Sequence, residues 1–224
     1  MTKVIKNRIL SQLHFLKSIG YEYHEPIKAF NKEVEEDTLP NDINSLGQIV
    51  NNCYLCELSK NRKNVLFGYG NINASIMFLI DEPTTTEDEL DSFYVGKSGE
   101  QLAKMIENVL PVKKEDVYIT SLVKCKSQNG FESTHFNSCS SYLYKQIDLI
   151  QPKLIVTLGD KTYQYLCKDK TPFYQIRGKL TNFKNYDVLP TYSPGFLLRN
   201  PSFKKEAFQD MLKIKSILES NWKI

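Results

Sequence analysis

Residues 76–80 read Ile-Met-Phe-Leu-Ile, an unbroken apolar run that is followed at once by Asp81-Glu82-Pro83. The run has the length of a strand and suits one that is buried on both faces of a parallel sheet. Three further runs of this kind follow, the last of them weaker, at residues 117–123, 154–158 and 188–192. Helical periodicity lies between and after them, at residues 98–110, 137–151, 161–168 and 203–220. Strands that alternate with helices predict an α/β layer architecture with a mostly parallel sheet.

The composition is that of an ordinary globular chain, with 224 residues, 41% of them apolar and 25% charged. These values exclude disordered, collagen-like and mucin-like proteins. No apolar run approaches the roughly 20 residues of a membrane helix, and basic residues interrupt the apolar positions near the N-terminus, so we expect neither a membrane partner nor a signal peptide. The chain is therefore predicted to be cytoplasmic and monomeric, with its five cysteines reduced.

The first part of the chain differs in character from the rest. Residues 2–19 place apolar side chains at helical spacing, and Gly20 follows as a stop signal. An aromatic and then acidic stretch without a functional motif continues to about residue 41. We therefore predict an N-terminal helical extension over residues 1–45, followed by an α/β domain over residues 46–224.

Positive charge gathers near the C-terminus. The formal net charge is only +3, but residues 161–224 contain 12 lysines and arginines against 5 aspartates and glutamates. Such an excess favours a polyanionic partner, although a solvated lysine-rich surface has the same composition.

Four cysteines occur near the expected ends of structural elements. Cys53 and Cys56 form a C-x2-C pair before the first strand, Cys125 follows the second strand, and Cys139 begins a helix. Two closely spaced thiols and two distant ones can supply four sulfur ligands to zinc or to an iron–sulfur cluster, and the spacing alone leaves both open. Cys167 lies within a helical pattern and is predicted to be a small buried side chain instead.

Further short motifs follow the cysteine pair and the first strand in a fixed order. They are Tyr94-Val95-Gly96-Lys97-Ser98-Gly99, Lys124-Cys125, Pro152-Lys153-Leu154, Arg177-Gly178, and Pro190-Thr191-Tyr192-Ser193-Pro194 with Leu197-Leu198-Arg199. Over about residues 50–215 this order resembles the family 4 uracil-DNA glycosylases, the iron–sulfur members of their superfamily. The resemblance implies a three-layer αβα fold with a four-stranded, mostly parallel sheet. It also implies a [4Fe–4S] cluster on the four cysteines and removal of uracil from DNA in base-excision repair.

The resemblance assigns roles to residues in the turn after the first strand and in the motif that follows it. In that family an acidic residue of a Gly-Glu-Ala-Pro-Gly turn lies at the attacking water, and this position corresponds to Asp81, with Glu82 beside it. A phenylalanine stacks on the flipped base, and its position corresponds to Tyr94, with Phe93 adjacent. We therefore expect Asp81 to be catalytic and the other three residues to contact the substrate.

Two further positions depart from the family pattern. The asparagine that reads the base corresponds to Ser121, and the histidine that donates to the departing base corresponds to Ser193. A serine hydroxyl cannot offer an amide's paired donor and acceptor, and losing one preorganised donor to an anion typically slows a reaction about 10²- to 10³-fold. Ser193 is thus a weaker catalytic donor, and Arg199 is expected to reach a phosphate near the lesion. A glycosylase with altered base preference fits this pattern, and so does a catalytically degenerate DNA-binding protein of the same fold.

Overall fold

The computed structural model describes residues 15–21 and 39–221, and the chain divides into two compact units. In the first unit, residues 15–18 form a helical turn. It ends at Gly20, whose φ of +90° is readily adopted only by glycine and is typical of a helix C-terminus. The predicted end of the first helix therefore agrees with the structure, while residues 2–14 of that helix lie outside the described residues.

The second unit extends from Leu39 to Ile224. It includes helix α2 (Ile43–Asn51), which begins where Asp42 accepts a hydrogen bond from the Ser45 amide at 2.8 Å. The division between residues 45 and 46 stays a prediction, while the compact unit begins at Leu39.

The second unit is built on a sheet that has six strands among the described residues, in the order β1-β3-β2-β4-β6-β5. Their bounds are β1 Tyr69–Gly70, β2 Ile76–Ile80, β3 Tyr118–Ser121, β4 Leu154–Leu158, β5 Thr181–Phe183 and β6 Tyr186–Thr191. The inner four, β3, β2, β4 and β6, are parallel and confirm the four predicted strands. The outer two pair antiparallel. The sequence predicted four strands and missed these two edge strands, because they are too short to show a burial pattern.

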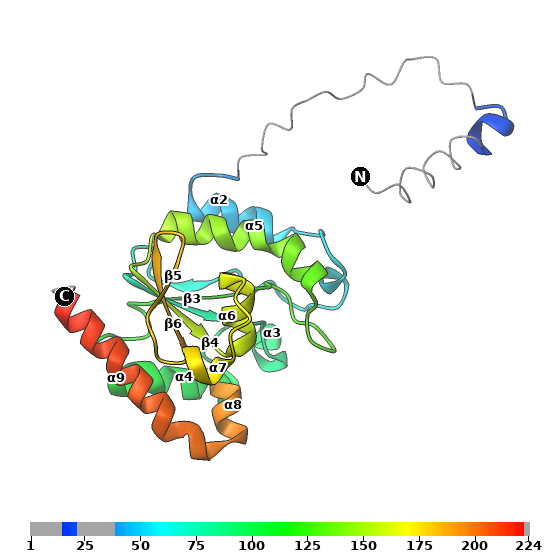
Figure 1. Ribbon diagram of the computed structural model, residues 1–224. Helices are drawn as coiled ribbons and strands as arrows, with labels where there is room; N and C mark the ends of the chain where they lie inside the picture. The colour runs from blue at the N-terminus through cyan, green and yellow to red at the C-terminus, as the bar shows by residue number, and fades with distance from the viewer. Residues whose placement is uncertain (1–14, 22–38, 222–224) are drawn as a thin grey trace. The chain divides into compact units, whose positions relative to one another are not determined.

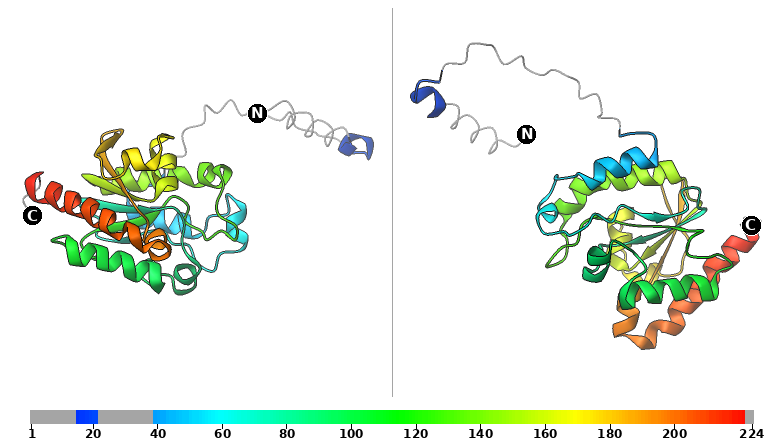
Figure 2. Two further views of the ribbon diagram at one scale, coloured as in Figure 1. Left: turned by 60° about the horizontal axis from the view of Figure 1, so that its bottom comes forward. Right: turned by 180° about the vertical axis from the view of Figure 1, so that it is seen from behind.

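Helices cover both faces of the sheet (Figure 1). Besides α2, they are α3 Thr85–Leu90, α4 Gly96–Val109, α5 Ser133–Ile150, α6 Asp160–Cys167, α7 Phe173–Ile176, α8 Pro194–Arg199 and α9 Lys204–Asn221, with short 3₁₀ turns at Glu57–Lys60 and Pro201–Phe203. Helices α2 and α5 lie on one side of the sheet, and α4 and α9 lie on the other, as the rotated views in Figure 2 also show. This confirms the predicted three-layer α/β fold.

The inner strands have apolar side chains on both faces. On β2, Ile76 and Phe78 belong to the core that packs against α4 and α9, whereas Met77 and Leu79 belong to the core that packs against α5. All four side chains are almost completely buried. A strand covered on both sides needs a continuous apolar run, which is why the local pattern identified it.

The carboxyl ends of the four parallel strands meet at one edge of the sheet, where ligands bind in open α/β folds. No helix within the described part of the chain has the length and apolar composition needed to cross a membrane.

Candidate active site and metal centre

A cavity of about 330 Å³ opens at the carboxyl edge of the sheet. Segments that are far apart in the sequence contribute to its wall, namely the turn after β2, the first turns of α3 and α4, the loop after β3, and α8 with the residue before it. The lining residues are Ile80, Asp81, Glu82, Pro83, Thr84, Thr85, Glu87, Ser98, Gly99, Leu102, Lys126, Ser193, Pro194, Gly195 and Arg199. Four of the predicted site residues, Asp81, Glu82, Ser193 and Arg199, therefore meet in one cavity that is large enough for a pyrimidine.

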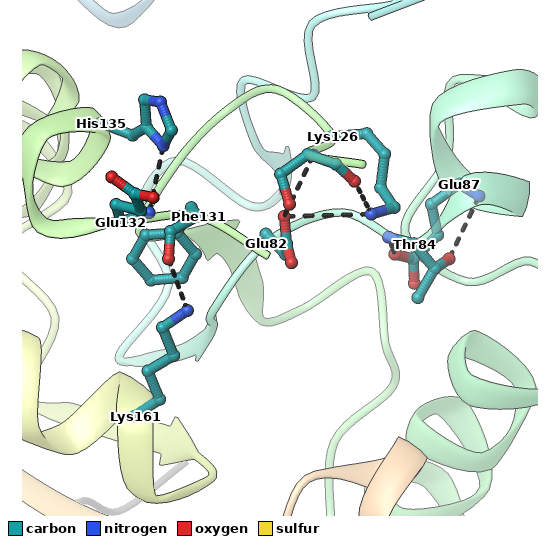
Figure 3. A network of polar contacts seen from close by, with 9 residues as sticks. Glu82, Thr84, Glu87, Lys126, Phe131, Glu132, His135 and Lys161 are labelled. Carbon is teal, nitrogen blue, oxygen red and sulfur yellow. Dashed lines mark hydrogen bonds and ion pairs between the residues drawn. The ribbon is translucent and has the colours of Figure 1, made fainter. Parts of the chain in front are cut away.

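The two acidic residues after β2 differ in their surroundings. Burial raises the pKa of the Asp81 carboxyl and the negative charge of Glu82 adds to this, while backbone N–H groups and the positive charge of Lys161 oppose it. Glu82 Oε2 accepts a hydrogen bond from the Ser127 amide at 3.1 Å and another from the Ser127 hydroxyl. Glu82 thus fastens the loop after β3 to this turn (Figure 3).

A third carboxyl, that of Glu87, lies in the cavity wall at the start of α3. Thr84 and Glu87 form a reciprocal capping box, in which the Thr84 amide donates to Glu87 Oε2 at 2.7 Å and the Glu87 amide donates to Thr84 Oγ1 at 3.3 Å. Glu87 is almost completely buried, and this burial raises its pKa to about 7, with a smaller contribution from Asp81. The capping role explains why a glutamate occurs at this position.

Replacing Glu87 with glutamine is expected to stabilise the protein above about pH 7. The unfolded chain releases this proton near the ordinary pKa of 4.5, whereas the folded protein keeps it until about pH 7, so wild-type stability falls between these values. Glutamine preserves the acceptor for Thr84 but cannot ionise, and at about pH 8 the variant should be more stable by up to about 3 kcal/mol. Urea unfolding at about pH 4.5 and pH 8 measures this, and an equal difference at both values would contradict it.

Ser193 lies between β6 and α8 and caps that helix. Its Oγ accepts a hydrogen bond from the Phe196 amide at 3.3 Å. A Cβ atom added to Gly159, after β4, would lie 3.5 Å from the Ser193 Cβ, so the ends of two neighbouring strands approach closely here. The Ser193 hydroxyl therefore already serves as an acceptor, while its own proton stays available for donation.

Three predicted substrate-binding residues do not line this cavity. Phe93 is only 3% exposed and belongs to the core under α4. The Tyr94 ring packs against the same core and makes an edge contact with Tyr69, with 5.9 Å between ring centroids. Ser121 is fully buried at the end of β3, and its Oγ has no hydrogen-bond partner among the described residues. The sequence motifs identified the strand ends correctly but not which side chains face the cavity.

The four predicted ligand cysteines come together at a second place. Cys53, Cys56, Cys125 and Cys139 all line one small enclosed pocket, although Cys139 lies 86 positions after Cys53. Cys167 is not part of this pocket. It is the last residue of α6 and packs against the core, and burial raises the pKa of its thiol to about 12.

The pocket is suited to thiolates. Arg62 Nη1 donates to Cys125 Sγ at 3.2 Å, and the Leu55 amide donates to Cys53 Sγ at 3.5 Å. Lys124, a fully buried lysine, also lines this pocket, and its charge opposes the rise that burial causes in the pKa of Cys139. No three His, Cys, Asp or Glu side chains in the described ranges are gathered so that they could hold a single metal ion. Four thiols around one pocket, one of which accepts a hydrogen bond from the Arg62 guanidinium, form a donor set that fits a sulfur-ligated metal centre.

Asp88, in the first turn of α3, connects this helix to the segment that follows Cys56. Its carboxylate accepts hydrogen bonds from the Lys63 and Asn64 amides at 3.0 to 3.2 Å, while Asn64 Nδ2 donates to the Asp88 carbonyl oxygen at 2.7 Å. Asp88 therefore holds a loop against the first turn of α3.

Comparison with known proteins agrees with this arrangement. The model of the uracil DNA glycosylase superfamily matches residues 67–213. The chain therefore belongs to this superfamily. A type-4 uracil-DNA glycosylase of Saccharolobus solfataricus is 36% identical over 189 residues, which cover 80% of this chain and 88% of that protein. The enzyme of the same description from Thermotoga maritima is 32% identical over 180 residues, 78% of this chain and 93% of that protein. Within the superfamily the chain belongs to the type-4 uracil-DNA glycosylases.

One further similar protein is much longer than this chain. A DNA polymerase of Bacillus phage SP01 is 27% identical over 154 residues, which cover 68% of this chain but only 17% of the polymerase. A segment similar to this chain therefore also occurs within a larger protein.

Proposed function

We propose that this protein is a uracil-DNA glycosylase that hydrolyses the bond between uracil and deoxyribose in DNA repair. The observation that carries the proposal is the single cavity that joins Asp81 to Ser193 in a chain of the type-4 family. Its volume of about 330 Å³ accommodates a base that has been flipped out of the duplex.

Asp81 is the residue that we assign to the water. The bond between C1′ and N1 breaks with its electron pair going to the base, and the oxygen of a water molecule forms a new bond to C1′. One proton of this water passes to the Asp81 carboxylate, and the base departs as an anion that then takes up a proton from solvent to become uracil. Burial supports this role, because a raised pKa makes the Asp81 carboxylate a better proton acceptor.

Ser193 is assigned a single neutral hydrogen bond to the departing base. It lies in the cavity wall, and its hydroxyl carries no charge, unlike a protonated imidazole. Ser121 was assigned to base reading from the family pattern, and its unpartnered Oγ remains a candidate for this role if substrate binding exposes it. Phe93 and Tyr94, which pack in or against the core, stay candidates for base stacking if substrate binding exposes their rings.

Replacing Ser193 with histidine is expected to raise the rate of uracil excision by about 10²-fold. The imidazole would add a preorganised donor for the negative charge of the departing base. Loss of the Ser193 cap on α8 would cost about 1 kcal/mol of stability. Single-turnover excision from a uracil-containing oligonucleotide measures the rate, with Ser193→Ala as the control that loses the cap without gaining a donor. A histidine variant no faster than the alanine variant would contradict the assignment.

The four cysteines are proposed to hold a [4Fe–4S] cluster. Zinc is the alternative that their spacing leaves open, but it needs its thiolate ligands around a single ion, a grouping that the described residues do not form. When bound, the cluster supplies cross-links between the cysteine loop, the loop after β3 and α5. The enclosed pocket and the hydrogen bonds to two of the sulfurs support this. All five cysteines are free thiols in the structure, which suits a reducing compartment such as the cytoplasm.

DNA is the proposed partner, bound by a monomer. Arg199 lines the cavity at its exposed side, where it can meet a phosphate next to the flipped nucleotide. The basic excess of residues 161–224 includes Lys204 and Lys205 close by in sequence, and we expect DNA affinity to fall steeply with salt.

The experiment that tests the function is a single-turnover assay on single- and double-stranded DNA containing uracil. Abasic product formed by the wild type, and absent with undamaged DNA, supports the glycosylase. The serines at positions 121 and 193, where the family pattern has asparagine and histidine, favour a second candidate, a DNA-binding module without excision activity. Salt-dependent DNA binding without abasic product from uracil or any other deaminated base would establish that alternative.

A further inference from the structure

The cavity wall carries carboxyl groups at the point where the proposed reaction adds negative charge. Those of Asp81, Glu82 and Glu87 line it together with two cationic side chains, and Glu87 keeps its proton until about pH 7. In the proposed reaction the base departs as an anion, and an ionised carboxylate beside it would repel it. The neutral hydroxyl of Ser193 offsets little of this repulsion, whereas a cation in the cavity wall offsets more.

Lys126 is placed to be that cation. It belongs to the loop after β3, directly after a cluster cysteine, and lines the cavity together with Asp81 and Ser193. Its side chain is only 23% exposed, so water screens its charge less than that of a surface lysine. Arg199, the other cation of the wall, is exposed, as a residue that meets the DNA backbone should be.

The surroundings of Lys126 hold it in place without using up its donors. Its Nζ donates to the Ser127 carbonyl oxygen and lies 4.0 Å from Glu82 Oε2, the contacts drawn in Figure 3. Glu82 Oε2 also accepts two hydrogen bonds from Ser127, and its ion pair with the ammonium group is long, without a hydrogen bond between them. An ammonium group has three donors, and the described residues leave two of them for a ligand.

We propose that Lys126 donates a hydrogen bond to the departing base and stabilises the negative charge that develops on it. The proposal rests on the function proposed above and assigns to Lys126 the charge stabilisation that Ser193 cannot provide. The bonds that break and form are unchanged: the electron pair of the C1′–N1 bond goes to the base, and Lys126 keeps its protons while it donates.

The leaving group itself provides the test. A more acidic base needs less stabilisation of its negative charge, so loss of an anion donor slows its release less. Lys126→Met should slow single-turnover excision of uracil about 10²-fold but that of 5-fluorouracil only about 10-fold or less. Lys126→Arg should keep most of the activity because it keeps the charge. Lys104→Met is the matched control, since it removes the same charge from an exposed position on α4 outside this cavity.

An equilibrium measurement decides the proposal independently of turnover. 5-Nitrouracil is a pyrimidine that is already an anion at neutral pH, and thymine is its neutral counterpart. Titration of the cluster-containing full chain should show 5-nitrouracil binding about 10-fold more weakly to Lys126→Met than to the wild type, with thymine binding and DNA affinity unchanged.

The outcomes separate this proposal from the function on which it rests. Equal slowing of both bases, or an unchanged affinity for 5-nitrouracil, would overturn the role of Lys126 while leaving the glycosylase intact. A wild type that excises neither base would overturn the glycosylase, and the titration would still show whether Lys126 recognises an anionic pyrimidine. If Lys126→Met loses the absorbance near 400 nm, it no longer holds the proposed cluster, and Lys126→Gln takes its place in both measurements.

Discussion

Asp81→Asn is expected to slow uracil excision by about 10²- to 10⁴-fold, the usual contribution of a positioned general base. The amide keeps the shape of the side chain but cannot accept the proton of the attacking water. Because burial raises the pKa of Asp81, wild-type activity should decline on acidification at a higher pH than an ordinary aspartate would cause, as the carboxylate becomes protonated. Single-turnover rates over a range of pH values measure both effects.

The matched control for this variant is Asp91→Asn. Asp91 is exposed at the end of α3 and has a φ of +50°, a conformation that asparagine adopts readily. It should therefore retain wild-type activity, and DNA affinity should be the same for both variants. An Asp81→Asn protein that still excises uracil at the wild-type rate would remove Asp81 from the mechanism.

Cys139→Ser is expected to abolish the iron–sulfur absorbance near 400 nm in anaerobically purified protein and to lower its iron content. Because a metal centre that forms only in the folded state contributes its binding free energy to folding, the variant should lose stability on the order of 5 kcal/mol. Absorbance, metal analysis and urea unfolding measure these effects. A wild type that contains zinc and shows no such band would assign the same four thiols to zinc.

Cys167→Ser provides the comparison for a cysteine outside the pocket. This thiol packs against the core beside α6 and shares no pocket with the other four. It should keep the absorbance band and lose only about 1 kcal/mol of stability, as for a small buried apolar group that becomes polar. Loss of the band in this variant would contradict the assignment of the ligands.

The sequence predicted the inner strands within a few residues of their observed bounds, since each is a continuous apolar run that must be buried on both faces. The structure begins β6 at Tyr186, two residues before the predicted start, because that first part pairs with β5 at the edge of the sheet. Short elements such as α3 and α8 were not predicted as helices. Each is held by a cap at Thr84 or Ser193, and six residues are too few to show a helical period.

The site was predictable only in part. Asp81 and Ser193 were expected at strand ends, and the structure joins them in one cavity. Phe93 carries the right side chain for stacking, but the packing of α4 turns it into the core. Gly99 shows how tight this packing is, because a Cβ at that position would lie 2.6 Å from the Phe93 carbonyl oxygen. Glu87 and Lys126 lie in the segments after β2 and β3, where a site was expected, but the sequence did not indicate that these two side chains line the cavity.

Local pattern thus determined the four inner strands, helices α4, α5, α6 and α9, and which four thiols are available, because burial and periodicity are properties of consecutive residues. Only the tertiary structure decided that Lys126 and Asp81 line the same cavity and that the four cysteines surround one pocket. These contacts join segments that are distant in sequence, and they depend on the position of β2 between β3 and β4 in the sheet. Such placement follows from the packing of the whole core, which no short stretch of sequence contains.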